Sequence, residues 1–254
     1  MSGTIMNFAA SIQTLRKAAM IGASAAALLM LAPSAHASSL VTNGSFEQNG
    51  GNSGKIGSDA SLTDWNANGG YTFLYTSYAA SAITVDTVSI WSPISAPSSN
   101  NGFTSGSPDG GAFVAADGDY GTQPLTQTIN GLTVGDTYAV SFYWAASQQT
   151  NWTGDTLQDW IVSLGSQTFT TPTYSLPSEG FSGWMPETFV YTATNTSETL
   201  SFLAYGNVQY PPFLLLDGVT MAPTPEPATL PLLFTGLMGG MGVLRSRKWL
   251  KRSR

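Results

Sequence analysis

The chain has 254 residues, of which only 9% are charged, and its formal net charge is −6. Eight of its nine basic residues lie before residue 18 or after residue 244, so the segment 38–222 keeps one, Lys55, against 14 acidic residues. This excess of negative charge repels phosphate backbones and argues against nucleic-acid binding. The chain has no cysteine and one histidine, His36, so disulfides, Cys–His or Ser–His catalysis and His-ligated metals are excluded from that segment.

Residues 1–37 have the three parts of a secretory signal peptide. Arg16 and Lys17 precede an apolar run over 18–31, and the small-residue triplet 35–37 provides a cleavage site. The run is too short for an ordinary membrane-spanning helix. We expect Sec-type export machinery to carry the chain across the inner membrane and the leader to be removed. The alternative is an apolar N-terminal helix that stays in place.

The middle segment, residues 38–222, is predicted to be all-β. Short stretches rich in aromatic and β-branched residues alternate with Gly, Ser, Thr, Asn and Pro. Apolar and small side chains alternate over 138–145, which is the period of a strand. The expected strands are 40–46, 71–76, 85–91, 112–115, 125–129, 138–145, 160–164, 167–170, 187–193, 200–205 and 213–221. This pattern predicts one antiparallel jelly-roll sandwich.

Several short motifs occur in a distinctive order along this segment. They are VTNGSFE at 41–47, PDGG at 108–111, LTQTI at 125–129, YAVSF at 138–142 and LDGV at 216–219. Their order resembles the galactose-binding-like jelly rolls, which include many bacterial carbohydrate-binding modules. In that family a calcium ion commonly ties the first strand to the last, and the matching positions here are Glu47 and Asp217. The chain departs from the family at Gly218, where members usually have a second acidic residue.

Two aromatic residues are candidates for carbohydrate binding, because sugar rings stack on exposed aromatic side chains. Trp152 lies in the polar loop 148–155, and Tyr143 faces away from the apolar side of its predicted strand. The alternative is that most tryptophans fill the core, and Trp144 is expected there.

A cluster of three acidic residues, Asp109, Asp117 and Asp119, lies among glycines in the middle of the segment. Such a pattern can form a calcium loop, although it more often forms a turn in which an aspartate caps its own backbone. A pair of carboxylates can also serve glycoside hydrolysis. With 14 acidic residues in the segment, such pairs arise by chance.

The C-terminal segment, residues 223–254, combines three elements. Pro225-Glu226-Pro227 precedes an uncharged stretch over 228–244, and a tail with six basic residues follows it. As a helix, the stretch would be roughly 26 Å long at about 1.5 Å per residue, slightly less than a hydrocarbon core of about 30 Å. The basic tail is predicted to stay cytoplasmic. The alternative is a plain anchor preceded by a linker.

These three elements resemble the PEP-CTERM sorting signal of Gram-negative bacteria. The resemblance implies that an exosortase processes the tail after transient anchoring in the inner membrane. It also implies a final place at the cell surface or in the extracellular matrix, together with exopolysaccharide in a biofilm.

Three functions follow as hypotheses. The first is a non-enzymatic surface protein that binds extracellular polysaccharide and presents two or three exposed aromatic rings on one concave face or loop rim. The second is a purely structural matrix protein with a polar, threonine-rich surface. The third is a carboxylate-dependent glycoside hydrolase with two facing carboxylates about 5–10 Å apart. We expect no catalytic residues and no cofactor besides structural calcium.

Overall fold

The structure is a computed structural model that describes residues 38–76, 83–85, 88–91, 107–207 and 210–224. The predicted signal peptide, the motif Pro225–Pro227, the predicted spanning helix 228–244 and the basic tail lie outside these ranges. Within the described ranges, no helix is long and apolar enough to cross a membrane.

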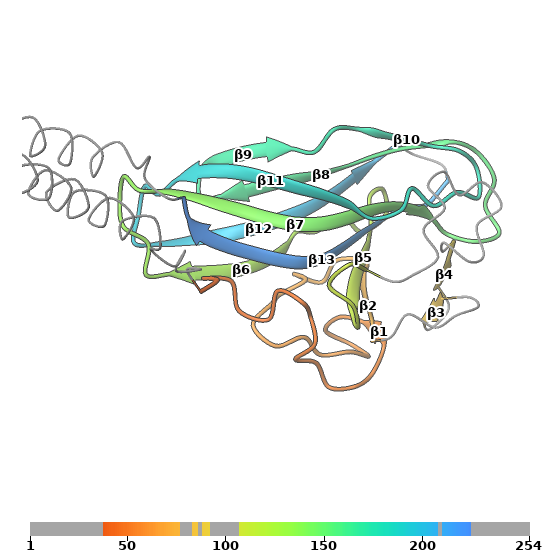
Figure 1. Ribbon diagram of the computed structural model, residues 1–254. Helices are drawn as coiled ribbons and strands as arrows, with labels where there is room; N and C mark the ends of the chain where they lie inside the picture. Colours follow the sequence, from red (N-terminus) through yellow and green to blue (C-terminus); the bar gives the residue numbers. More distant parts are fainter. Residues whose placement is uncertain (1–37, 77–82, 86–87, 92–106, 208–209, 225–254) are drawn as a thin grey trace, which may run out of the picture. The chain divides into compact units, whose positions relative to one another are not determined.

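Two antiparallel sheets form the folded body (Figure 1). The larger sheet has the strand order β1-β2-β5-β13-β7-β11, and the smaller has the order β10-β8-β12-β6 with β9 paired to β8. The larger sheet consists of β1 (Gly54–Lys55), β2 (Thr72–Tyr75), β5 (Phe113–Asp117), β7 (Thr137–Gln148), β11 (Met185–Thr192) and β13 (Pro212–Pro223). The smaller consists of β6 (Leu125–Asn130), β8 (Thr156–Leu164), β9 (Gln167–Thr170), β10 (Tyr174–Leu176) and β12 (Ser197–Gly206). A short hairpin pairs β3 (Ile83–Val85) with β4 (Val88–Ile90).

The strand connections are those of a jelly roll. From β5 to β8, and again from β11 to β13, the chain passes to the other sheet at every step. The predicted all-β antiparallel fold is therefore confirmed. Most expected strands coincide with observed ones to within a few residues, and β7 contains the alternating stretch 138–145.

The predicted first strand, 40–46, is wrong, because this segment consists of bends and turns. Asn43 and Phe46 have φ angles of 49° and 58°, and such left-handed conformations interrupt an extended backbone. Two hydrogen bonds still tie the segment to β13. The Leu40 N–H donates to the Met221 carbonyl (2.8 Å), and the Val219 N–H donates to the Gly44 carbonyl (2.9 Å).

The main core lies between the two sheets. Phe202 of β12 is fully buried, and its ring lies 5.1 Å from Phe142, 6.1 Å from Trp160 and 6.2 Å from Trp65. Trp144 is also buried, as predicted. Trp65 belongs to the N-terminal segment that precedes β2. This segment therefore covers the main core together with the two sheets.

A second apolar cluster covers the opposite face of the larger sheet. Its residues are Phe73, Tyr75, Val88, Ile90, Phe113, Ala115, Ala145, Phe181, Trp184, Phe213 and Leu215. Tyr143 is half-buried and packs against this cluster, so its ring is less available to a sugar than the sequence suggested. Over β2, β5 and β13, the larger sheet is therefore buried on both faces.

Candidate functional site

One candidate site surrounds an irregularity in β13. The pairing of β13 with β7 shifts register between Asp217 and Thr220, and Asp217 lies opposite Tyr143. Gly218 has a φ angle of 60°, and a Cβ atom there would approach the Tyr143 ring to 2.9 Å. Glycine is thus required at the position where the resembling family has an acidic residue.

The Asp217 carboxylate is fully buried. Its Oδ1 accepts a hydrogen bond from the Gly218 N–H (2.7 Å), whereas its Oδ2 has no partner within the described residues. The Asp217 pKa is raised to about 8 overall: burial is the largest cause, hydrogen bonds from Ser107 and Gly218 partly offset it, and the charges of Asp109 and Glu47 add to it. A buried carboxylate oxygen without a donor is costly, and a cation bound to it would offset that cost.

Glu47 reaches this region from the N-terminal segment. Its Oε1 accepts a hydrogen bond from the Ala112 N–H (2.5 Å). Gly111 has a φ angle of 69°, and a Cβ atom there would lie only 1.8 Å from Glu47 Oε1. Asp109 also lies close, because a Cβ atom on Gly218 would come within 3.2 Å of the Asp109 Cβ. The structure therefore brings Asp109 to the predicted pair, Glu47 and Asp217.

The oxygen atoms at this site provide only some of the ligands that a hard cation requires. Within the described residues, no three acidic or histidine side chains approach closely enough to hold a metal by themselves. Calcium accepts backbone carbonyl, hydroxyl and water oxygens together with carboxylates. The unpartnered Asp217 Oδ2 could therefore serve as one ligand, with Glu47 and neighbouring backbone oxygens completing the set.

Asp117 and Asp119 form a turn and do not join Asp109. Asp117 Oδ1 accepts hydrogen bonds from the N–H groups of Asp119 (2.8 Å) and Tyr120 (3.1 Å). This is the backbone-capping alternative that the sequence left open. Burial raises the pKa of Asp117 to about 6, and these two N–H bonds partly offset that effect.

A second candidate site lies where loops from both sheets meet, at the ends of β5, β7 and β12 and the starts of β8 and β13 (Figure 1). Three backbone hydrogen bonds join these loops. The Gly118 N–H donates to the Pro212 carbonyl (2.8 Å), the Gly206 N–H to the Gly118 carbonyl (2.9 Å), and the Gln149 N–H to the Pro211 carbonyl (3.1 Å). We call this part of the surface the aromatic end.

The aromatic end carries three exposed rings: Tyr120 is 69% exposed, Tyr205 57% and Trp152 46%. The Tyr120 ring stands edge-on to Tyr71, with ring centroids 5.2 Å apart. Trp152 lies two residues before Gly154, where a Cβ atom would collide with the Tyr210 ring at 2.3 Å. Tyr210 therefore packs against the loop of Trp152.

Of these three residues, Trp152 was predicted from the sequence, whereas Tyr120 and Tyr205 were not. For Tyr205, the alternation along the predicted strand 200–205 would have placed the ring opposite the core-facing Phe202. For Tyr120 no periodic signal exists, because it belongs to the turn that Asp117 caps. Its exposure depends on how that turn lies against β2.

Comparisons with known proteins do not assign this chain to a family. No family model matches the chain, and no curated protein matches it. Several solved structures resemble the chain weakly, with TM-scores between 0.34 and 0.38. The CBM22-1 xylan-binding domain of Paenibacillus barcinonensis Xyn10C is 11% identical, and the match covers 75% of this chain and 97% of that one, with a TM-score of 0.38.

Two other matches cover a similar share of this chain. TmCBM61, solved with β-1,4-galactotriose, is 14% identical over 73% of this chain and 99% of that one, with a TM-score of 0.36. The enzymatically active domain of bacteriophage CBA120 tailspike protein 4 is 14% identical over 73% of this chain, with a TM-score of 0.35. This chain spans about a fifth of that tailspike chain, with 21% covered. Likeness at this level does not indicate what this chain binds.

Proposed function

We propose that the domain is a non-enzymatic carbohydrate-binding module whose aromatic end contacts polysaccharide. The observation that carries this proposal is that three exposed rings lie at one end of the fold: Tyr120 and Trp152 are on loops and Tyr205 is near the end of β12, and backbone hydrogen bonds join these segments. Exposed rings offer apolar faces to the C–H groups of sugars, and the tyrosine hydroxyls add polar contacts. Loops fixed by backbone hydrogen bonds hold such rings in place before the ligand arrives, which lowers the entropy lost on binding.

Replacing Trp152 or Tyr205 by alanine should weaken binding to the best glycan at least about tenfold, equivalent to about 1.4 kcal/mol, because each change removes a stacking surface. We would identify that glycan on a polysaccharide array with the purified full-length chain and measure affinity by calorimetry. Phe169→Ala is the matched control, since Phe169 is also exposed but lies on β9. Unchanged affinity in both end variants would refute the proposal.

A structural matrix role remains the second candidate, and one observation favours it. The exposed face of the smaller sheet is rich in hydroxyls, contributed by Thr126, Thr128, Ser163, Thr199 and Ser201 on β6, β8 and β12. A polar face of this kind can remain hydrated within a polysaccharide gel without a defined binding site. Failure of every glycan on the array to bind would favour this role.

We also propose that the protein is exported and sorted through its C-terminal signal. Glu226 lies between two prolines in the sequence. Because proline disfavours a helical backbone at its own position and at the preceding residue, we expect a processing enzyme to recognise this motif outside the bilayer. Glu226→Ala should leave the uncleaved protein in the inner membrane, as fractionation and immunoblotting would show. Thr224→Ala is the control and should be released normally, whereas normal release of Glu226→Ala would contradict the sorting proposal.

A further inference from the structure

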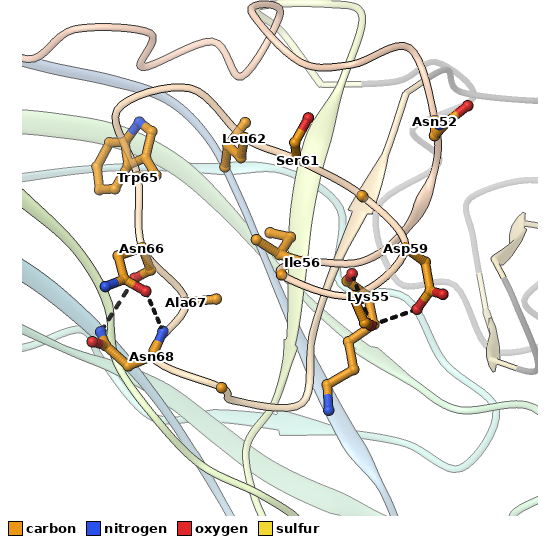
Figure 2. A pocket seen from close by; sticks show the side chains of 14 residues that line it. Asn52, Lys55, Ile56, Asp59, Ser61, Leu62, Trp65, Asn66, Ala67 and Asn68 are labelled. Carbon is orange, nitrogen blue, oxygen red and sulfur yellow. Dashed lines mark hydrogen bonds between the residues drawn. The ribbon is translucent and has the colours of Figure 1, made fainter.

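A hollow of about 640 Å³ lies in the N-terminal segment, between residues 52 and 69 (Figure 2). Its volume is within the range of small-ligand sites, about 300–1,000 Å³. The side chains of Ile56, Leu62 and Trp65 line its base, and all three are buried in the main core. The Trp65 indole N–H also donates to the Asn43 carbonyl (3.0 Å). The base of the hollow is therefore fixed by the fold.

The groups that face solvent around this base are mainly amides and hydroxyls. Four exposed residues carry them: Asn52, Ser61, Asn66 and Asn68. Figure 2 shows Asn66 and Asn68 beside one another on one wall of the hollow. In the part of the chain that the structure describes, the Ser61 hydroxyl makes no hydrogen bond and the Asn66 amide nitrogen donates none. Neutral groups that donate and accept in this way suit the hydroxyls of a sugar.

The wall of Asn66 and Asn68 is joined to the turn that carries Tyr120. The Asn68 amide nitrogen donates to the Pro124 carbonyl (2.7 Å), just after this turn. The Tyr71 N–H, three residues beyond Asn68, donates to the Gly121 carbonyl (2.9 Å). The wall of the hollow and the Tyr120 turn of the aromatic end are therefore held in one hydrogen-bonded framework.

Side chains continue this connection at the surface. Lys55 lines the hollow, and its Nζ lies 5.8 Å from the centroid of the Tyr71 ring. The Tyr71 ring in turn stands edge-on to the exposed Tyr120 ring, with centroids 5.2 Å apart. Both separations are those of direct contact, up to about 6 Å for a cation over a ring and about 4.5–7 Å for two rings. Lys55 and Tyr71 therefore form a shared border, and the hollow and the Tyr120 ring belong to one continuous surface.

The charges around this surface favour an uncharged ligand. The segment 38–222 carries 14 acidic residues against one lysine, and Asp59 is exposed on the rim of the hollow. This excess of negative charge repels an anionic sugar but not a neutral one. We propose that the hollow is a second subsite of the aromatic end, in which amides and hydroxyls hold further units of the same neutral polysaccharide chain that Tyr120 contacts. This inference rests on the proposed carbohydrate binding and adds the class of chain and the place of its further units.

The test compares the disaccharide and the hexasaccharide of three neutral series, the cello-, xylo- and malto-oligosaccharides, by calorimetry with the purified full-length chain. In a series that binds, the hexasaccharide should bind at least about tenfold more tightly than the disaccharide, because only the longer chain reaches both subsites. Amide hydrogen exchange should slow over residues 57–69 with the hexasaccharide and not with the disaccharide.

Asn66→Ala tests the second subsite directly. It should weaken hexasaccharide binding about threefold to tenfold, the effect of one lost hydrogen bond, and leave disaccharide binding unchanged. Ser61→Ala should act in the same way, and its hydroxyl holds nothing in the described fold. Asn130→Ala is the matched control at the far end of β6, because Asn130 is also exposed and its Oδ1 also accepts one hydrogen bond, from Ser197 Oγ (2.8 Å). This control should bind both probes like the wild type.

The outcomes separate this inference from the proposed function. Equal affinity for the two chain lengths, or hexasaccharide binding unchanged in both Asn66→Ala and Ser61→Ala, would overturn the second subsite and leave the aromatic end in place. Hexasaccharide binding that depends on Asn66 but is unchanged in Tyr120→Ala would overturn the continuous surface. If no series binds, or if Trp152→Ala and Tyr205→Ala leave disaccharide binding unchanged, the proposed function itself fails and this inference with it.

Discussion

Adding calcium to the chelator-treated protein should raise its melting temperature by about 5–10 °C. A ligand that binds only the folded state stabilises it by RT ln(1 + [L]/Kd), about 2.7 kcal/mol at a hundredfold excess over Kd. In a domain of this size, 1 kcal/mol shifts the melting temperature by about 2–4 °C. The physical reason is the buried Asp217 carboxylate, whose Oδ2 has no donor within the described residues. Tryptophan fluorescence during heating would measure the shift.

Asp217→Asn distinguishes cation binding from an ordinary structural role. With calcium the variant should melt below the wild type, because a charged ligand is lost. In chelator it should melt at about the same temperature, because a pKa of about 8 leaves the Asp217 carboxyl largely protonated near pH 7, so that one neutral group replaces another. Asp117→Asn is the matched control, since Asp117 is also buried but caps a turn elsewhere. Its calcium response should equal that of the wild type, and identical curves for the wild type with and without calcium would refute the site.

Gly44→Ala should destabilise the fold by about 3 kcal/mol or more, through overpacking that backbone atoms cannot relieve. A Cβ atom at residue 44 would lie 1.8 Å from the Val219 carbonyl oxygen and 2.8 Å from its carbon. Relief requires separating the N-terminal segment from β13, which breaks the hydrogen bond between the Val219 N–H and the Gly44 carbonyl. Because this segment carries Glu47, the calcium response should decrease as well.

Gly50→Ala is the matched control for this change. Like Gly44, Gly50 has no left-handed φ angle, but a Cβ atom there would meet only the Ser61 hydroxyl, at 2.8 Å, which can rotate away. We expect a cost below about 1 kcal/mol for this variant, as judged by urea unfolding. If both variants unfold at the same urea concentration, the close approach between Gly44 and Val219 does not hold the segment in place.

The fold class was predictable because strand periodicity is a local property. The alternation over 138–145 indicated which side of β7 would face the core, and Trp144 is buried accordingly. The segment 40–46 was predicted as a strand from its alternation of apolar and polar residues, although Asn43-Gly44 is a local turn signal and the Phe46 N–H bonds to the Asn43 carbonyl (3.2 Å). The local sequence does not encode the docking of this segment on β13 and β6 through long-range hydrogen bonds.

Composition alone established which residue types are available for chemistry in this domain. A segment with one lysine, no cysteine and no histidine has few routes to catalysis, whatever its fold. Which of the remaining groups lie near one another depends on the folded arrangement of the loops. Asp109 joined Glu47 and Asp217, whereas Asp117, only eight residues further along, caps a turn at the aromatic end. The physical reason is that loops between strands take their positions from long-range sheet pairing, so neighbours in sequence separate and residues 170 positions apart, such as Glu47 and Asp217, come together.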